Sequence, residues 1–350
     1  MRRVRCGALI AAFSMLFVAG AFARERMPDW VTTPYKAYPA ELYVAAVGSS
    51  ASRAAAEVEA IRGIAAVFGQ SVASTTIVSK RMTQAQEDGM VAVTTSSASI
   101  DDSVRRQVDA DTIVAVEIRG AWRDERRAMW HVIAVMDKKA AAVTYASMIR
   151  QNHAALRSLL ERVHTEPRLE DYAVLDFAES VACVTDGYLA RLTVLAASEA
   201  EMLAAPEFSA GVVRARLREL AALIPIAVQI GSDSEGRVAK ALSETVSARG
   251  FTVIDAAKGG QAARYLLRAN ITKFEQNVAD KRGLFVIDFT VVGAFIDLVT
   301  GEEVIPFTLS GSEGSKTAEN ARVRVYTTME RAVRQRFDSA FTAYLDGFSL

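Results

Sequence analysis

The sequence predicts an α+β protein built from two αβ modules with mostly antiparallel sheets packed by helices, joined by a helical hairpin segment. Three observations lead to this prediction. A β-rich run followed by an amphipathic helix occurs near both ends of the chain, and the stretch between them keeps helical periodicity. The 350 residues, 51% of them hydrophobic, suffice for two cores. We therefore divide the chain into residues 24–137, 138–222 and 223–350, after a signal peptide at residues 1–23.

The first 23 residues have the three parts of a secretory signal peptide. A basic start, MRRVRC, precedes the apolar run GALIAAFSMLFVAGAF, and Ala21 and Ala23 form a small-x-small cleavage site before Arg24. The alternative is an uncleaved anchor helix, because the apolar run is only slightly short for a bilayer. Cys6 lies before the apolar run and not at its end, so we expect no lipid there. The expected localisation is periplasmic, with no transmembrane span after cleavage.

Cleavage after Ala23 removes three of the 41 basic residues and leaves 38 against 41 acidic ones, a net charge of about −3. This nearly neutral mixture lacks the basic field that binding to nucleic acid requires. Cys183 is then the only cysteine, so no internal disulfide is expected and the fold depends on its core.

The first module begins after a proline-punctuated stretch. The run Leu42–Val47 predicts a strand, and Gly48 predicts a sharp turn out of it. One of Ser49, Ser50 or Ser52 is expected to cap the helix that follows. The helix is indicated by apolar residues that recur every three or four positions, namely Val58, Ile61, Ala65, Phe68 and Val72.

Two further β-rich regions complete this module. Residues 74–100, rich in Thr, Val and Ser, predict one or two long exposed strands. Residues 111–122 and 128–137 predict a hairpin across the charged RDERR. The second hairpin strand is apolar on both faces, with Trp130, Val132, Ala134 and Met136 on one and His131, Ile133 and Val135 on the other. Such a strand is expected to be central or covered by helices.

From Lys138 to about Leu223 the periodicity is helical, with an interruption at Pro167. It predicts an antiparallel helical hairpin followed by a shorter helix at 209–224. The two hairpin stripes are Ile149, His153, Leu156, Leu160 and Val163, then Val174, Phe177, Val181, Val184 and Tyr188. We interpret them as core contacts, with a partner-binding groove as the alternative.

A second αβ unit starts at Ile224. Residues 224–231 predict a strand, and Ser232 with Glu235 predicts a capping box for a helix that ends at Gly250. Strands are expected at 251–256 and 266–274, with a short helix or turn between them. Residues 284–299 and 302–311 predict a long hairpin, and a docked last helix starts at Thr317. Its apolar stripe is Met329, Val333, Phe337, Phe341 and Leu345.

Known patterns for catalysis and metal binding do not fit the chain. No two of His131, His153 and His164 have the i, i+4 spacing of a helical metal site, and no Cys-x-x-Cys occurs. Cys183 lies in an apolar helical setting, which predicts a small buried hydrophobe and not a nucleophile. No serine lies in a Gly-x-Ser-x-Gly elbow. We therefore predict no enzyme activity, no catalytic residue, no cofactor and no metal.

The glycine-containing loops also lack the residue patterns of known phosphate, calcium and nucleotide sites. A phosphate cradle needs several glycines, whereas Gly48 is alone and no lysine follows it. The loop GSDSEG lacks the acidic ladder of a calcium site, and AKGGQAAR lacks the spacing of a nucleotide loop. Gly48 is therefore interpreted as a marker of the fold.

An ordered set of motifs resembles the LPP-twenty lipoprotein family of bacterial envelopes and the N-terminal module of FlgT-like flagellar assembly proteins. The set is Pro28-Asp29-Trp30, Tyr43 with Ala46-Val47-Gly48, an alanine-rich helix at 54–56, and the hairpin of Trp122. Residues 224–350 are similar, more loosely, to the αβ domain of TolB's N-terminus, LpoB and CsgG. Trp30, Gly48, Trp122 and Gly231 are the expected fold-defining residues. The helical segment and the missing lipobox depart from the lipoprotein pattern.

The resemblance implies a non-catalytic envelope adaptor that assists assembly of flagellar, secretion or cell-wall machinery. Its partners would be envelope proteins or a second copy of the chain, through residues 74–100 and the helical hairpin. The alternative is a periplasmic protein that binds a small ligand or glycan in a pocket between sheet and helix. An enzyme is the third hypothesis.

Overall fold

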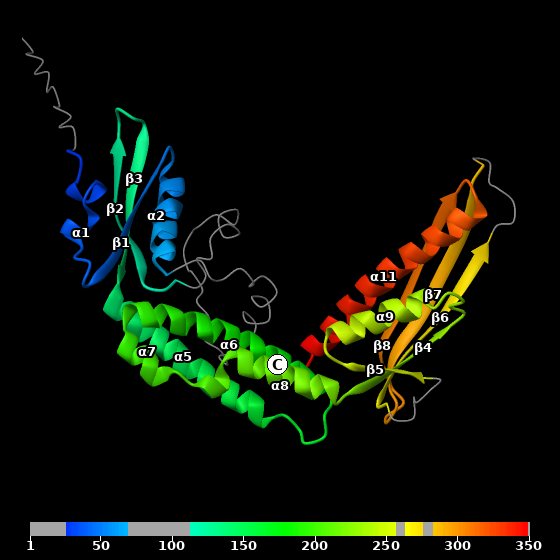
Figure 1. Cartoon of the computed structure of the whole chain (residues 1–350). Coiled ribbons are helices and arrows are strands. Elements are labelled where there is room, and N and C mark those ends of the chain that lie inside the picture. Colours follow the sequence, from blue (N-terminus) through cyan, green and yellow to red (C-terminus); the bar gives the residue numbers. More distant parts are fainter. Residues whose placement is uncertain (1–25, 69–112, 257–262, 276–282, 349–350) are drawn as a thin grey trace, which may run out of the picture.

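The structure is a computed structural model that describes residues 26–68, 113–256, 263–275 and 283–348 (Figure 1). Two sheets lie at opposite ends of a helical segment, which is the α+β architecture that the sequence predicts. The predicted cleavage residues Ala21 and Ala23 and the predicted strands at 74–100 lie outside the described residues.

The N-terminal module has a three-stranded antiparallel sheet in the order β1-β3-β2. β3 is central, as its apolar character on both faces predicts. Helix α2 packs on one face, and Trp30 of η1 packs on the other against Ile133 and Val135. The elements are η1 (Asp29–Val31), α1 (Pro34–Ala37), β1 (Tyr43–Ser50), α2 (Arg53–Val67), β2 (Val116–Asp124) and β3 (Met129–Asp137).

The helical segment begins at Lys138, directly after β3. Its two long helices form the antiparallel hairpin that the sequence predicts, with the ring of Tyr145 5.7 Å from that of Tyr188. The buried side-chain amide of Asn152 donates to the Thr185 hydroxyl at 3.1 Å and fixes the register of the pair. The elements are α5 (Lys138–Glu161), α6 (Leu169–Leu195), α7 (Ala197–Leu203), η3 (Pro206–Phe208) and α8 (Ala210–Ala222).

The C-terminal module has a five-stranded mixed sheet in the order β5-β4-β6-β7-β8. β4 runs parallel to β5 and to β6, whereas β6, β7 and β8 form antiparallel pairs. Helices α9 and α11 cover one face of this sheet (Figure 1). The elements are β4 (Pro225–Gly231), α9 (Arg237–Ala248), β5 (Thr252–Asp255), β6 (Tyr265–Glu275), β7 (Phe285–Asp297), β8 (Glu303–Ser315) and α11 (Ala318–Asp346).

The last helix docks as its periodicity predicts, because the whole stripe from Met329 to Leu345 is buried. The rings of Phe295, Phe337 and Phe341 meet between α11 and the sheet, with centroids 5.5–6.1 Å apart. No described helix covers the other face of the sheet. There Thr272 of β6 and Thr308 and Ser310 of β8 are exposed.

Helix α6 belongs to all three large apolar clusters of the molecule. Its first turns, with Leu169 and Tyr172, join the core of the C-terminal module. Phe177 and its neighbours pack with α5 and α8 in a middle cluster. Tyr188 and Leu192 near its end join the core of the N-terminal module.

The predicted turn at Gly48 is wrong. Strand β1 continues through Gly48 to Ser50, and Gly48 lies opposite Val132 of β3. A Cβ at this position would overlap the carbonyl oxygen of Ala56 and the backbone nitrogen of Ala60 in α2. Glycine is needed here because strand and helix backbones nearly touch, and not because the chain turns. The helix cap is Ser52, whose Oγ accepts from the Ala55 amide at 3.2 Å.

The predicted capping box of Ser232 and Glu235 is also wrong. The chain turns twice before α9, at Ser232 with φ 61° and at Gly236 with φ 68°. The helix starts only at Arg237, and the carboxylate of Asp233 accepts from the Ala239 amide at 2.8 Å.

We expect Gly48→Ala to lower the free energy of unfolding by about 1–3 kcal/mol, because the added methyl group must push α2 away from β1. Urea denaturation measures the loss. The control is Gly211→Ala in α8, where a Cβ would meet nothing within 4 Å. That variant should keep its stability or gain up to about 1 kcal/mol. Equal stability of the two variants would contradict the close strand–helix contact.

Candidate functional site

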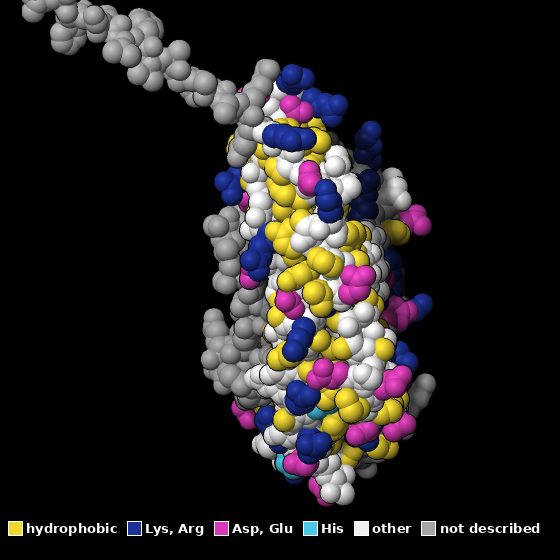
Figure 2. Space-filling view, turned by 90° about the vertical axis from the view of Figure 1, so that its left-hand side faces the viewer, with side chains coloured by type: hydrophobic (Ala, Val, Ile, Leu, Met, Phe, Trp, Pro, Cys, Tyr) yellow, Lys and Arg dark blue, Asp and Glu magenta, His cyan; other side chains and the backbone are white. Residues whose placement is uncertain are grey.

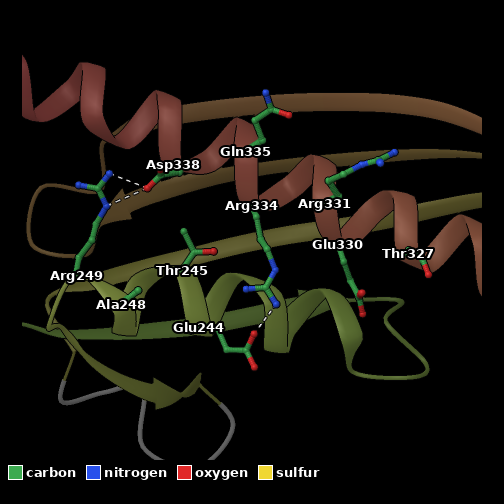
Figure 3. A pocket seen from close by; sticks show the side chains of 10 residues that line it. All are labelled: Glu244, Thr245, Ala248, Arg249, Thr327, Glu330, Arg331, Arg334, Gln335 and Asp338. Atoms are coloured by element: carbon green, nitrogen blue, oxygen red, sulfur yellow. Dashed lines mark hydrogen bonds and ion pairs between the residues drawn. The ribbon is translucent and has the colours of Figure 1, made fainter. Parts of the chain in front are cut away.

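An open groove runs between α9 and α11 on the helical side of the C-terminal module (Figure 3). Its volume is about 670 Å³. The lining residues are Glu244, Thr245, Ala248 and Arg249 from α9, and Thr327, Glu330, Arg331, Arg334, Gln335 and Asp338 from α11. The groove is therefore lined almost entirely by polar and charged side chains.

Amphipathic helices produce this lining. α9 buries Val238, Leu242 and Val246 against the sheet, and α11 buries its own apolar stripe beside them. The polar residues between those stripes are left along the line where the two helices meet. The helices run in the same direction, since Arg237 pairs with Glu330 and Arg249 with Asp338.

Three ion pairs join α9 to α11 along the groove, and the sign of the charge on each helix alternates from one pair to the next. Arg237 forks onto Glu330, with Nε–Oε1 at 2.6 Å and Nη2–Oε2 at 3.1 Å. Arg334 of α11 pairs with Glu244 of α9. The third pair is Arg249 with Asp338, whose Nη2–Oδ1 distance is 2.7 Å. We call this set the ionic ladder. Its alternation specifies which residues of the two helices lie opposite each other.

The ladder is anchored to the sheet at one end. Arg237 lies over the ring of Tyr326, 5.5 Å from its centroid. Lys273 of β6 lies on the same ring at 4.5 Å, and its Nζ donates to the Tyr326 hydroxyl at 2.7 Å. The aromatic ring therefore contacts two cations from two elements.

The ladder shifts the pKa of its carboxylates. The hydrogen bond from Arg237 holds the pKa of Glu330 below its usual 4.5, and Arg334 does the same for Glu244. The hydrogen bond to Glu330 in turn raises the pKa of Arg237. A carboxylate with a lowered folded-state pKa stabilises the fold above its unfolded-state pKa, and this contribution is lost as the pH falls below about 4.5.

The charged ends of the lining side chains are mostly paired, and the surface they leave in the groove consists largely of their apolar stems. Of its ionised lining residues, Arg331 alone has no ion-pair partner among the described residues. Gln335 is exposed one turn further along α11. These two side chains are available to a partner, whereas the ladder residues already satisfy one another.

A second cluster brings a serine and a histidine together in the N-terminal module. Ser49 and His131 are opposite each other across β1 and β3, with Oγ and Nδ1 2.7 Å apart. The His131 ring stacks on Trp122 at 5.5 Å. The Glu59 carboxylate accepts from the backbone amide of Ser49 and does not orient the imidazole. Nucleophilic catalysis needs a group that orients the base, so this contact defines no triad.

The remaining histidines have structural contacts. His153 packs on Phe208 at 5.3 Å, and burial lowers its pKa. The Nδ1 atom of His164 lies 2.8 Å from the buried carboxylate of Asp171, near the start of α6.

The predicted burial of Cys183 is wrong. Its helix turns this position to the surface, where Arg214 of α8 lies 4.0 Å from the sulfur. Partial burial nevertheless raises the pKa of the thiol, which is the opposite of what a nucleophilic cysteine requires.

The four expected fold-defining residues do not lie in the groove. Trp30, Gly48 and Trp122 belong to the N-terminal module, and Gly231 ends β4, where a Cβ would lie 2.5 Å from the Asn270 side chain. The alternating charges of α9 and α11 were the available signal for the groove. These charges indicate a groove only once it is known that the two helices, whose paired residues are 89 to 93 positions apart, lie side by side.

The described part of the chain offers neither a metal centre nor a membrane span. Across the described ranges, no three His, Cys, Asp or Glu side chains converge so that they could hold a metal ion. No described helix combines the length and apolar character needed to cross a bilayer. On the face shown in Figure 2, acidic and basic side chains are interspersed among apolar ones, and neither sign of charge dominates.

Comparison with known proteins gives structural likenesses only. No protein-family model matches the chain, and no curated protein matches its sequence. The secreted protein HP1454 from Helicobacter pylori is similar over 83% of this chain and 96% of its own, with 12% identity and a TM-score of 0.40. A minor lipoprotein from Acinetobacter baumannii covers 36% of this chain and 90% of its own, with 17% identity and a TM-score of 0.21. PelC from Paraburkholderia phytofirmans, a dodecamer, covers 31% and 86%, with 17% identity and a TM-score of 0.23.

The first of these neighbours is described as a secreted protein and the second as a lipoprotein, but likenesses this distant establish no family. The resemblance to LPP-twenty, FlgT-like and TolB-N-like proteins stays a prediction.

We expect a double-mutant cycle of Arg237→Gln and Glu330→Gln to give a coupling energy of about 1 kcal/mol at pH 7, because this pair is forked and about 70% buried. Urea denaturation measures it. The coupling should fall progressively as the pH drops from about 4.5 through the lowered pKa of Glu330, because the carboxylate is then protonated. The control cycle, Arg268→Gln with Glu303→Gln, removes a pair that is more than half exposed and should couple less. Coupling that is unchanged in acid would contradict the ionic origin.

Proposed function

We propose that the chain is an exported, non-catalytic adaptor of the bacterial cell envelope that works through protein–protein contacts. Flagellar, secretion or cell-wall machinery is its proposed setting. The N-terminal sequence supports export, and the family resemblance of residues 28–137 and 224–350 supports the setting. The proposed localisation is periplasmic without a lipid anchor.

The single observation that carries the adaptor role is the continuity of α6 through three apolar clusters. A helix of 27 residues is about 40 Å long, and here its two ends are built into the cores of two different modules. Such a connection holds two binding surfaces at a fixed spacing, which an adaptor needs. Helix termini that are buried in both modules also resist independent motion of those modules.

The groove is the proposed contact surface of the C-terminal module. The ladder holds α9 and α11 together, so the groove presents a rigid surface, and Arg331 with Gln335 supplies groups that a partner can bind. A partner with a carboxylate opposite Arg331 would form a new ion pair without breaking the ladder.

Ligand binding between sheet and helix is less well supported. Phe295, Phe337 and Phe341 fill that space in the C-terminal module, and a filled apolar core leaves no room for a small molecule. The groove itself is wide and open, whereas small-ligand sites are usually enclosed.

We expect peroxidase-based proximity labelling in the native organism to recover envelope proteins around the chain. Arg331→Glu should reduce labelling of the groove partner at least about fivefold, since charge reversal replaces attraction with repulsion. The matched control is Arg336→Glu, an exposed arginine of the same helix that does not line the groove. It makes the same charge change and should leave labelling intact.

Different outcomes test different parts of this proposal. If the chain labels no more envelope proteins than a secreted peroxidase alone, the adaptor role is wrong. If Arg331→Glu and Arg336→Glu label the same partners equally, the adaptor role stands and the groove is not its contact surface. Mass spectrometry of the mature N-terminus tests export and cleavage independently.

A further inference from the structure

Strand β8 ends the five-stranded sheet and leaves one long edge without a strand partner among the described residues. The strand covers Glu303–Ser315, and Thr308, Ser310 and Ser312 are exposed. An edge of this length is a template for pairing with another strand. The other end of the sheet is the four-residue strand β5, which is much shorter.

The bonding pattern of the sheet determines which groups of β8 face outward. The amide of Leu298, just beyond β7, donates to the Arg264 carbonyl beside β6 at 2.8 Å. The β6–β7 register has no shift, and successive residues of an antiparallel strand bond to opposite neighbours. Even-numbered β7 residues therefore hydrogen-bond to β6, and odd-numbered ones hydrogen-bond to β8. The odd-numbered residues 305–315 of β8 lie opposite the odd-numbered residues of β7 and hydrogen-bond to them. The even-numbered residues 306–314 therefore direct their amides and carbonyls away from the sheet.

Two residues support this assignment and bracket the free edge. Pro306 has no N–H, which an outward-facing position tolerates and an inward-bonded one does not. At the other end, Nη1 of Arg324 donates to the Gly314 carbonyl at 3.3 Å, as expected for a carbonyl that faces away from β7. Between them, the outward amides and carbonyls of Thr308, Ser310 and Ser312 have no backbone partner within the described parts of the chain.

We propose that β8 pairs antiparallel with β8 of a second copy of this chain, with Ser310 on the two-fold axis. In this register Ser310 lies opposite itself, Thr308 opposite Ser312, and Pro306 opposite Gly314. The outward groups then form about eight interchain hydrogen bonds and join two five-stranded sheets into one. This inference does not depend on the adaptor role.

The two ends of the free edge complement each other in this register. An ordinary residue at 306 would donate its amide to the Gly314 carbonyl of the partner copy. Pro306 has no amide to donate, and the Gly314 carbonyl already accepts from Arg324. Every other outward group finds a partner, so no polar group is left unpaired at the interface.

Charge also favours a second copy as the occupant. Residues 304–312 contain no charged side chain, so self-pairing places no like charges opposite each other. The edge strand β2 of the N-terminal module is different. It carries the charged residues Glu117, Arg119 and Arg123 and a bulge in its middle, between Ile118 and Gly120, and both discourage pairing. The register shift of β8 lies between Glu303 and Ile305, before the residues that would pair.

The first test compares the purified full chain with Ser310→Lys by light scattering after size exclusion and by analytical ultracentrifugation. Two lysines opposite each other on the axis should raise the dimer dissociation constant at least about tenfold. The control is Thr272→Lys, on the same uncovered face of β6 but two strands from the edge. It should dimerise like the unmodified chain. Thermal unfolding of all three proteins checks that each is folded.

The second test measures the register. In a chain with Cys6 and Cys183 changed to serine, Ser310→Cys places two thiols on the axis, with Cα atoms about 5.5 Å apart. A short bis-maleimide should cross-link them. Ser312→Cys places its thiols roughly 14 Å apart and should cross-link poorly.

Dimerisation that Ser310→Lys weakens and Ser310→Cys captures would support the pairing. The proposal is wrong if the chain stays monomeric at about 0.1 mM, if Ser310→Lys dimerises like Thr272→Lys, or if both cysteine variants cross-link equally. A monomer whose β8 edge binds an extended peptide of another protein would also overturn it.

Discussion

The rest of the structure depends on the burial of α6 along its whole length. Most helices of a folded protein bury one stripe, but α6 passes from one module to the other and contacts neighbours on several sides. Leu169 is buried in the C-terminal core, Phe177 in the middle cluster and Leu192 in the N-terminal core. A shift of this helix would disturb all three clusters at once, so the two modules are mechanically linked.

Polar contacts specify the position of this helix where apolar contacts alone would not. Alanine and leucine side chains tolerate small changes in register, whereas the buried hydrogen bond of Asn152 to Thr185 exists in one register only. The Asp171 carboxylate plays the same role at the other end, where it accepts from the amides of His164 and Arg168. Both contacts restrain α6 relative to the chain before it.

The elements could be predicted from the sequence wherever local periodicity dictates burial. The central position of β3 follows from its two apolar faces, and the docking of α11 follows from its stripe. The role of Gly48 could not be predicted, because only tertiary packing shows how closely α2 approaches β1. Parallel pairing of β4 with β6, the exposure of Cys183 and the alignment of α9 with α11 likewise depend on long-range neighbours that periodicity does not encode.

The helical side and the β8 edge of the C-terminal module differ in how their polar groups are paired. On the helical side, the ladder lets opposite charges satisfy one another, so α9 and α11 present a surface whose charges are largely compensated. At the β8 edge, backbone groups have no strand partner among the described residues, and Pro306 and Arg324 stand at the two ends of this free stretch. Satisfied charges cost little to leave in water, whereas a regular backbone edge pairs readily with any extended strand. An edge that carries no charged side chain over residues 304–312 offers an association surface, and the matching of Pro306 with Gly314 favours its own copy over other strands.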